Sequence, residues 1–248
     1  MHNKRTHDYE WLFFDLDNTI LDFATSSRHA FYDAFDKYMI TLEAPQYKRY
    51  KEINHALWVK LEKGQISPEE LKIKRWADFI AEYNLKADPA VIDNSYLDHI
   101  SYNPIYVPDA LASIKQLSTK YKLCLVTNGL SQVQIPRLRL TGLEKYFKHI
   151  VISQDIGVAK PAKAFFDHCH NLAGKPMKDM VLVIGDTLTS DIKGGVDFGY
   201  DTCWFNFLEV ENDTEYKATY NVKTHNELME ILGSVSYTHL TLPTIYSV

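Results

Sequence analysis

Three short apolar runs, each ending at a polar residue, constrain the fold of this chain more than any other feature. The runs are residues 11–14, 123–126 and 181–185, and they end at Asp15, Thr127 and Asp186. Runs of this length with β-branched and aromatic residues are typical of strands buried on both faces, as in a parallel sheet covered by helices. Ligands bind beyond the carboxyl ends of such strands. We therefore expect the three endpoints, far apart in sequence, to meet at one edge of a sheet.

Helical patterns occupy the intervals around these runs. They cover residues 109–121, 133–140, 161–173 and 190–198. Alternation of strands and helices is the pattern of doubly wound α/β folds. The sequence therefore predicts a Rossmann-like core, with a doubly wound parallel sheet.

The alternation stops between about residues 23 and 106, where long amphipathic stretches follow one another. These stretches are residues 26–39, 45–63, 68–83 and, more weakly, 91–100. We predict an α-helical bundle inserted as a cap domain over residues 23–106, with the core formed by residues 8–22 and 107–233. Pro104 and Pro108 mark the return to the core and are compatible with a hinge or a stiff connector.

Charge and composition limit the partners that this chain is expected to have. Its 248 residues carry 27 basic and 32 acidic side chains, a formal charge of −5, and no stretch concentrates Lys and Arg. A nucleic-acid polymer is therefore an unexpected partner.

The amino-terminal residues contain no apolar segment long enough for a signal peptide or a membrane span, so we expect a cytoplasmic protein. Cys124, Cys169 and Cys203 are widely separated and are expected to be reduced packing residues.

Residues 234–248 differ from the rest of the chain. They include no Asp, Glu, Lys or Arg and fit neither an amphipathic helix nor a convincing strand. Two interpretations remain open, read-through from a cloning junction or an ordinary disordered tail. We leave this segment out of the fold prediction.

Asp15 and Asp17 lie two residues apart directly after the first apolar run. In extended backbone both side chains would point the same way. Such a pair can divide labour, with one carboxylate attacking phosphorus and the other handling protons. Acidic residues are also common where strands give way to turns, so the pair alone fits either interpretation.

The polar residues that follow the second run suit a phosphoryl group. Thr127, Asn128 and Gly129 can offer a hydroxyl and backbone N–H groups, and the glycine lets the backbone approach closely, although Asn-Gly is also an ordinary turn. Lys160 precedes Pro161 and a predicted helix, where its ammonium could neutralise phosphate charge. A single lysine is more often simply solvated.

Asp186 and Asp191 follow the third run. Carboxylate oxygens are hard ligands of the kind that Mg²⁺ prefers. Ser190 or Asp191 could instead cap the following helix. Each motif is thus ordinary by itself, but four of them in order, each after its predicted strand, are far rarer by chance.

Together these motifs resemble the four signatures of the haloacid dehalogenase superfamily. The matching residues are Asp-x-Asp-x-Thr at 15–19, Thr127, Lys160 and Gly-Asp-x(4)-Asp at 185–191. The resemblance extends to Leu232 and is specific for the superfamily but not for a substrate. It implies phosphate chemistry, because the dehalogenase branch lacks an acid at the position of Asp17 and an alkoxide leaving group needs a proton.

The resemblance also implies a role for each acidic residue. Asp15 would be the nucleophile that forms an aspartyl-phosphate, and Asp17 would protonate the leaving oxygen and then activate water. Mg²⁺ would be held by the Asp15 and Asp186 carboxylates and the Asp17 backbone carbonyl. Asp191 would support the metal through water or by orienting Lys160.

Thr127, Asn128 and Lys160 would bind the phosphoryl oxygens. The cation, the lysine and backbone donors would offset the repulsion between a dianionic phosphate and a carboxylate. Proton transfer by Asp17 would supply only about 10²- to 10⁴-fold of the acceleration.

The inserted bundle resembles the first cap class of the superfamily, in which a helical lid closes over the site. Finer features resemble its pyrimidine-type 5′-nucleotidase branch, namely Asn54-x(3)-Trp58, residues 63–67, Arg75, Gln134-x-x-Arg137, residues 141–143 and residues 203–206. This resemblance implies a small phosphate ester as substrate, a pyrimidine nucleoside monophosphate above all.

Two alternatives to the nucleotidase remain open. One is a sugar-phosphate phosphatase or phosphomutase, and the other is a non-catalytic module that senses a phosphorylated ligand. The complete set of acids argues against the sensor. A base could stack on Trp58 or meet Arg75, or the two residues could serve core packing and a surface ion pair.

Overall fold

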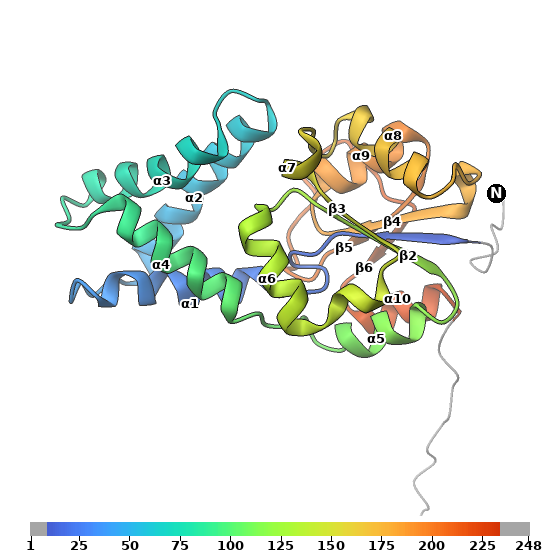
Figure 1. Ribbon diagram of the computed structural model, residues 1–248, viewed down its shortest axis with the longest axis horizontal. Helices are drawn as coiled ribbons and strands as arrows, with labels where there is room; N and C mark the ends of the chain where they lie inside the picture. Colours follow the sequence, from blue (N-terminus) through green and yellow to red (C-terminus); the bar gives the residue numbers. More distant parts are fainter. Residues whose placement is uncertain (1–8, 234–248) are drawn as a thin grey trace, which may run out of the picture.

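A computed structural model of the protein describes residues 9–233 (Figure 1). Residue 8 and the expectation for residues 234–248 lie outside the described part. The described chain forms one sheet of six parallel strands in the order β3-β2-β1-β4-β5-β6. The strands are β1 (Trp11–Phe14), β2 (Lys122–Thr127), β3 (His149–Ile152), β4 (Val181–Gly185), β5 (Asp201–Phe205) and β6 (Tyr220–Val222).

Helices cover both faces of this sheet (Figure 1). One face carries α5 (Ala110–Leu117), α6 (Ser131–Thr141) and α10 (His225–Ile231), and the other carries α8 (Lys163–Leu172) and α9 (Lys193–Phe198). Leu12 and Phe14 pack toward the first group and Phe13 toward the second, and all three are fully buried. Because neighbouring residues of a strand point to opposite faces, both faces must be covered. The predicted doubly wound core is confirmed.

The register brings the ends of the central strands level with one another. Phe14 of β1 pairs with Leu125 of β2 and with Ile184 of β4, and the Asp15 amide donates to the Ile184 carbonyl at 2.8 Å. Asp15 therefore leaves the sheet between the ends of its two neighbours. The three apolar runs end at a common edge, as the sequence predicts.

Four helices form the inserted bundle, which lies beside the carboxyl-terminal edge of the sheet (Figure 1). They are α1 (Phe23–Asp36), α2 (Ala44–Glu62), α3 (Pro68–Glu82) and α4 (Pro89–Tyr102). Their common core includes Tyr50 stacked on Trp76, with ring centroids 4.5 Å apart at an angle of 13°. The predicted helical cap is confirmed, and we propose residues 23–106 as its extent. Within residues 9–233, no helix is long and apolar enough to cross a membrane.

The two connections between cap and core run side by side. The Asp22 amide donates to the Ile105 carbonyl at 2.8 Å, and the Val107 amide donates to the Ile20 carbonyl at 3.0 Å. Leu130 and Val133, at the start of α6, also join the hydrophobic core of the cap. The cap is thus supported by its two connecting segments and by one helix of the core.

Some elements differ from the sequence prediction in detail. The predicted helix 190–198 starts as a π-helical turn, Leu188–Ile192, and continues as α9. Residues 203–205, which lie outside the three predicted strands, are part of β5. The apolar pattern did not single out β3 and β6, which lie at the two edges of the sheet and have 4 and 3 residues. The remaining short elements are α7 (Ser153–Ile156) and 3-10 turns at Leu143–Tyr146 and Lys178–Met180.

His225 ties α10 to the loop that follows β1. Its imidazole is fully buried, and Nε2 lies 2.8 Å from the carbonyl oxygen of Thr19, so we assign the proton to Nε2. Burial lowers the pKa of His225 to about 4. The folded protein therefore holds this ring neutral at pH values where the unfolded chain would protonate it.

We predict that His225 makes the protein less stable as the pH falls from 6.5, the ordinary pKa of histidine, towards 4. In this window the unfolded state binds more protons, so the free energy of unfolding decreases by about 1.4 kcal/mol per pH unit. The variant His225→Gln keeps an N–H donor but does not titrate. Between about pH 6.5 and about pH 5, the free energy of unfolding measured with urea should fall by about 2 kcal/mol less in the variant than in the unchanged protein. Equal drops in both proteins would contradict this assignment.

Candidate active site

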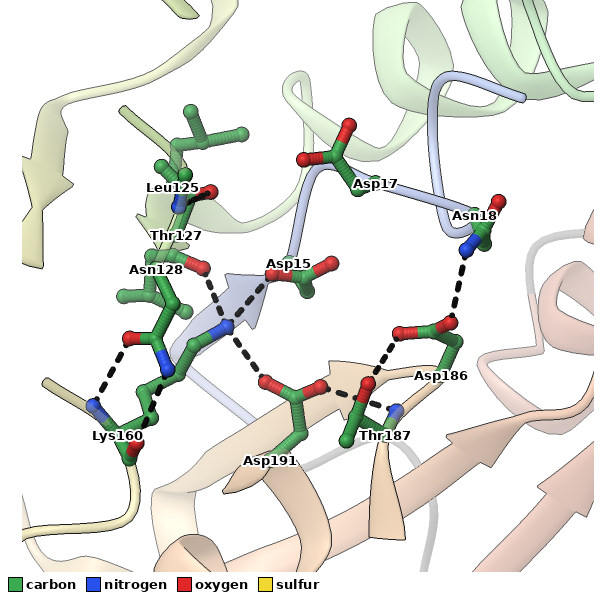
Figure 2. Close-up of polar contacts among 12 residues, drawn as sticks. Asp15, Asp17, Asn18, Leu125, Thr127, Asn128, Lys160, Asp186, Thr187 and Asp191 are labelled. Atoms are coloured by element: carbon green, nitrogen blue, oxygen red, sulfur yellow. Dashed lines mark hydrogen bonds and ion pairs between the residues drawn. The ribbon is translucent and has the colours of Figure 1, made fainter. Parts of the chain in front are cut away.

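Lys160 lies at the centre of the cluster at the sheet edge (Figure 2). Its Nζ is 2.6 Å from Asp15 Oδ1 and 2.6 Å from Asp191 Oδ1, and it donates to the Val126 carbonyl at 2.9 Å. Both carboxylates and the ammonium are buried. Burial by itself favours the neutral amine, but Asp15 and Asp191 raise the pKa of Lys160 above its usual value. The ammonium therefore stays charged between the two acids.

Asn128 fixes the backbone of Lys160. The Asn128 Nδ2 donates to the Lys160 carbonyl at 2.9 Å, and the Lys160 amide donates to Asn128 Oδ1 at 2.9 Å. The peptide bond between Lys160 and Pro161 is cis. The Asn128 side chain thus lies against Lys160, and a contact between Asn128 and a phosphoryl group remains a prediction.

Asp15, Asp186 and Asp191 form a group of carboxylates that could hold a cation, since one oxygen of each lies within 4.8 Å of the others. Burial raises the pKa of Asp15 well above its ordinary value, and Lys160 acts in the opposite direction. Burial and the charge of Asp191 raise the pKa of Asp186 to about 7. One ammonium does not balance three carboxylates, so a bound cation would relieve their mutual repulsion. Oxygen ligands of this kind fit a hard divalent cation.

Two residues outside the predicted set hold Asp186. Asn18 donates from Nδ2 to Asp186 Oδ2 at 3.1 Å, and the Trp204 indole donates to the Asp186 carbonyl at 2.8 Å. Asn18 has a positive φ of 55°, a conformation that asparagine tolerates better than most residues. An Asn placed directly after Asp-x-Asp was a possible signal for this role.

Gly185 makes room for Asp191. A Cβ atom at position 185 would lie 2.3 Å from Asp191 Cγ, closer than two unbonded atoms can approach. The π-helical turn places Asp191 there, and the Thr187 amide donates to Asp191 Oδ2 at 3.1 Å. The glycine and the second acid of the Gly-Asp-x(4)-Asp motif are therefore in contact with each other.

Asp17 lies apart from this cluster. Its carboxylate points away from Lys160 (Figure 2), and it accepts bonds from Gln134 Nε2 at 2.8 Å and from Arg137 Nη1 at 2.5 Å. Only its backbone carbonyl thus remains a candidate metal ligand. Gln134 and Arg137, which belong to the resemblance to the nucleotidase branch, were not among the predicted site residues. Their spacing of three residues, which puts both on one side of a helix, was the available signal.

A cavity of 410 Å³ connects the sheet edge to the cap. Its lining from the core includes Asp15, Asp17, Thr127, Lys160, Asp186 and Asp191. Its lining from the cap includes Tyr47, Tyr50, Lys51, Asn54, His55, Trp58, Arg75 and Tyr96. All predicted site residues therefore contribute to one space, which has a charged end and a largely aromatic end.

Arg75 is not a surface residue. It is 2% exposed, and its Nη2 lies 2.5 Å from Asp93 Oδ1 inside the cap. The interpretation of Arg75 as a surface ion-pair residue is therefore wrong, because its partner is as deeply buried as it is. Trp58 is only partly buried and lies at the same cavity. Both residues combine a packing role with a position at the cavity wall.

This fold and this arrangement of acids agree with comparisons to known proteins. Residues 9–199 match the family model of haloacid dehalogenase-like hydrolases, so the chain belongs to that family. It is a phosphatase-type hydrolase, since its relatives include proteins named as a 5′-nucleotidase and as a phosphatase.

Three relatives are informative. YfnB of Bacillus subtilis is 36% identical, and its crystal structure, bound to magnesium, superimposes with a TM-score of 0.83 over 90% of this chain and 98% of that one. The pyrimidine 5′-nucleotidase YjjG of Escherichia coli is 33% identical over 90% of this chain and 98% of its own length. The N-acylneuraminate-9-phosphatase of the mouse is 32% identical over 79% of this chain and 82% of its own.

We predict that Lys160→Met destabilises the folded protein by about 3–5 kcal/mol, because it leaves buried carboxylates without their cation. A carboxyl group whose pKa is raised on folding destabilises the fold as the pH rises towards that pKa. The free energy of unfolding that Lys160→Met loses should therefore be larger at about pH 8 than at about pH 5.5, as measured by urea unfolding in EDTA. The control is Lys163→Met, whose side chain is 76% exposed. A pH-independent loss, or an equal loss in the control, would contradict the buried charge network.

Proposed function

We propose that this protein is a Mg²⁺-dependent 5′-nucleotidase that hydrolyses pyrimidine nucleoside monophosphates through an aspartyl-phosphate at Asp15. The observation that carries the proposal is the contact of Lys160 with both Asp15 and Asp191 at the charged end of the cavity. A buried carboxylate beside a fixed ammonium and further oxygen ligands suits in-line attack on a phosphate.

The geometry supports a division of labour in the first step. Lys160 binds Asp15 Oδ1, which leaves Oδ2 as the oxygen available for attack on phosphorus. When bound, the cation supplies positive charge that offsets the repulsion between the phosphate and the carboxylates. As the Asp15–phosphorus bond forms and the ester bond breaks, Asp17 gives a proton to the leaving oxygen. Thr127 binds a phosphoryl oxygen, and the ammonium of Lys160, which already donates to Asp15, Val126 and Asp191, offsets the phosphoryl charge.

The second step returns the protein to its starting state. A water molecule attacks the phosphorus of the aspartyl-phosphate, and Asp17 accepts the proton of that water. The bond between Asp15 and phosphorus breaks, which releases inorganic phosphate and restores the carboxylate. Asp17 is again protonated for the next ester.

The aromatic end of the cavity supports a nucleotide as substrate. Trp58, which is only partly buried, lines it from the cap together with Tyr47. Stacking of a base on an aromatic side chain contributes about 1–3 kcal/mol and tolerates different bases. The similarity to YjjG, a pyrimidine 5′-nucleotidase by name, favours pyrimidine substrates.

A sugar phosphate is the second candidate substrate. The mouse relative is named for a phosphorylated acidic sugar and is 32% identical to this chain. Lys51, Asn54 and His55 lie at the same cavity and could bind a carboxylate and hydroxyl groups. The reaction would be the same, and only the contacts of the leaving group would differ.

Phosphate release from a panel of nucleoside monophosphates and sugar phosphates tests the proposed function. We expect release that requires Mg²⁺, stops in EDTA and is fastest with pyrimidine monophosphates. Asp15→Asn should abolish it, because the amide is not a nucleophile.

The other outcomes are equally informative. A preference for sugar phosphates would contradict the proposed substrate while leaving the chemistry intact. An isomerised ester without free phosphate would identify a phosphomutase. No turnover of any ester, or full activity of Asp15→Asn, would contradict the proposed mechanism.

A further inference from the structure

We propose that Gln134 and Arg137 are positioning residues that fix the carboxylate of Asp17 for proton transfer to the leaving group. This inference rests on the proposed function, in which Asp17 is the acid and base. It concerns the orientation of that carboxylate. It gives a role to two residues of α6 that the proposed mechanism does not use.

The contacts leave the Asp17 carboxylate little freedom. Arg137 Nη1 lies 2.5 Å from Oδ1, and Gln134 Nε2 lies 2.8 Å from Oδ2, so each oxygen has its own donor. Arg137 Nη1 also donates to Gln134 Oε1 at 2.7 Å. The three side chains form a closed set of hydrogen bonds, and Asp17 and Gln134 both line the cavity. Rotation of the carboxylate would break at least one of these bonds.

The burial of Arg137 argues that this contact has a function. The side chain is fully buried, and within residues 9–233 its Nε and Nη2 atoms have no hydrogen-bond partner. Burying a guanidinium with unsatisfied nitrogens is unfavourable, and an apolar residue of similar size would stabilise a helix face better. Its ion pair with Asp17, whose side chain is 26% exposed, is the charge pairing that offsets this cost, and the guanidinium also lies 5.8 Å from the centroid of the Phe23 ring.

Gly129 leaves the space that the Gln134 side chain occupies. A Cβ atom at position 129 would lie 2.1 Å from Gln134 Nε2, so any other residue would displace the amide. The same Nε2 donates to Thr127 Oγ1 at 3.0 Å. Gly129, predicted to allow a close approach of the backbone, thus also makes room for a side chain. Gln134 connects the predicted phosphate-binding hydroxyl to the predicted acid.

Orientation matters because an acid must lie within hydrogen-bonding reach of the oxygen that it protonates. Misplacement by about 1 Å can cost about 10²-fold in rate. The cost depends on the leaving group, since a poor leaving group such as an alkoxide needs the proton and a dinitrophenolate does not. A positioning role therefore predicts a rate loss that increases with the basicity of the leaving oxygen.

The experiment compares kcat/KM for 2,4-dinitrophenyl phosphate, phenyl phosphate and the best nucleoside or sugar monophosphate of the panel, with Mg²⁺ present. We expect Arg137→Met to lower kcat/KM about 10²-fold for the nucleoside or sugar monophosphate, which has an alkoxide leaving group. For the dinitrophenyl ester we expect a decrease of less than about threefold. Arg137→Lys, which keeps the charge, should recover part of the loss. The matched control is Arg139→Met, because Arg139 lies on the same helix and is exposed.

Gln134→Met removes one donor to Asp17 without changing a buried charge, so it tests the same point if Arg137→Met does not fold. It should show the same dependence on the leaving group. An equal loss on all three esters would overturn the inference in favour of a general structural role, and so would unchanged kinetics in both variants. If the unchanged protein hydrolyses aryl esters but no nucleotide, the proposed substrate fails while this inference still stands. No turnover of any ester by the unchanged protein would overturn both.

Discussion

The buried ammonium of Lys160 is the interaction on which the rest of this site depends. It contacts Asp15 and Asp191 at 2.6 Å each, and without it three neighbouring carboxylates, two of them buried, would have no positive charge among them. Such a cluster is costly unless its charges are paired. The fold provides for this pairing in several places. Asn128 holds the Lys160 backbone, and Gly185 leaves room for the Asp191 carboxylate.

The architecture and the convergence of the site could be predicted from the sequence. Apolar runs without alternation require a sheet that is covered on both faces, and parallel strands bring their carboxyl ends to one edge. Asp15, Thr127 and Asp186 meet there for this reason, and Lys160 and Asp191 follow from the loops beyond. The amphipathic stretches that interrupt the alternation predicted the cap equally well, because their apolar faces had to be buried and are buried mainly against one another.

The partners of each side chain could not be predicted in the same way. Gln134 and Arg137 reach Asp17 only because α6 packs with that face toward the loop after β1, and the rotation of a helix is set by tertiary packing. The burial of Arg75 depends on Asp93, which lies on another helix of the cap. Short edge strands such as β6 bury too few residues to leave a periodic pattern.

In the proposed mechanism, the core end of the cavity supplies the charge and the nucleophile, and the cap supplies the walls around the leaving group. We propose that Asp15 attacks phosphorus before water does. The stereochemistry of hydrolysis tests it most directly, with a substrate whose phosphorus is made chiral by oxygen isotopes. Two successive in-line displacements, first by Asp15 and then by water, predict retention of configuration. Inversion would mean a single attack by water and would contradict the account.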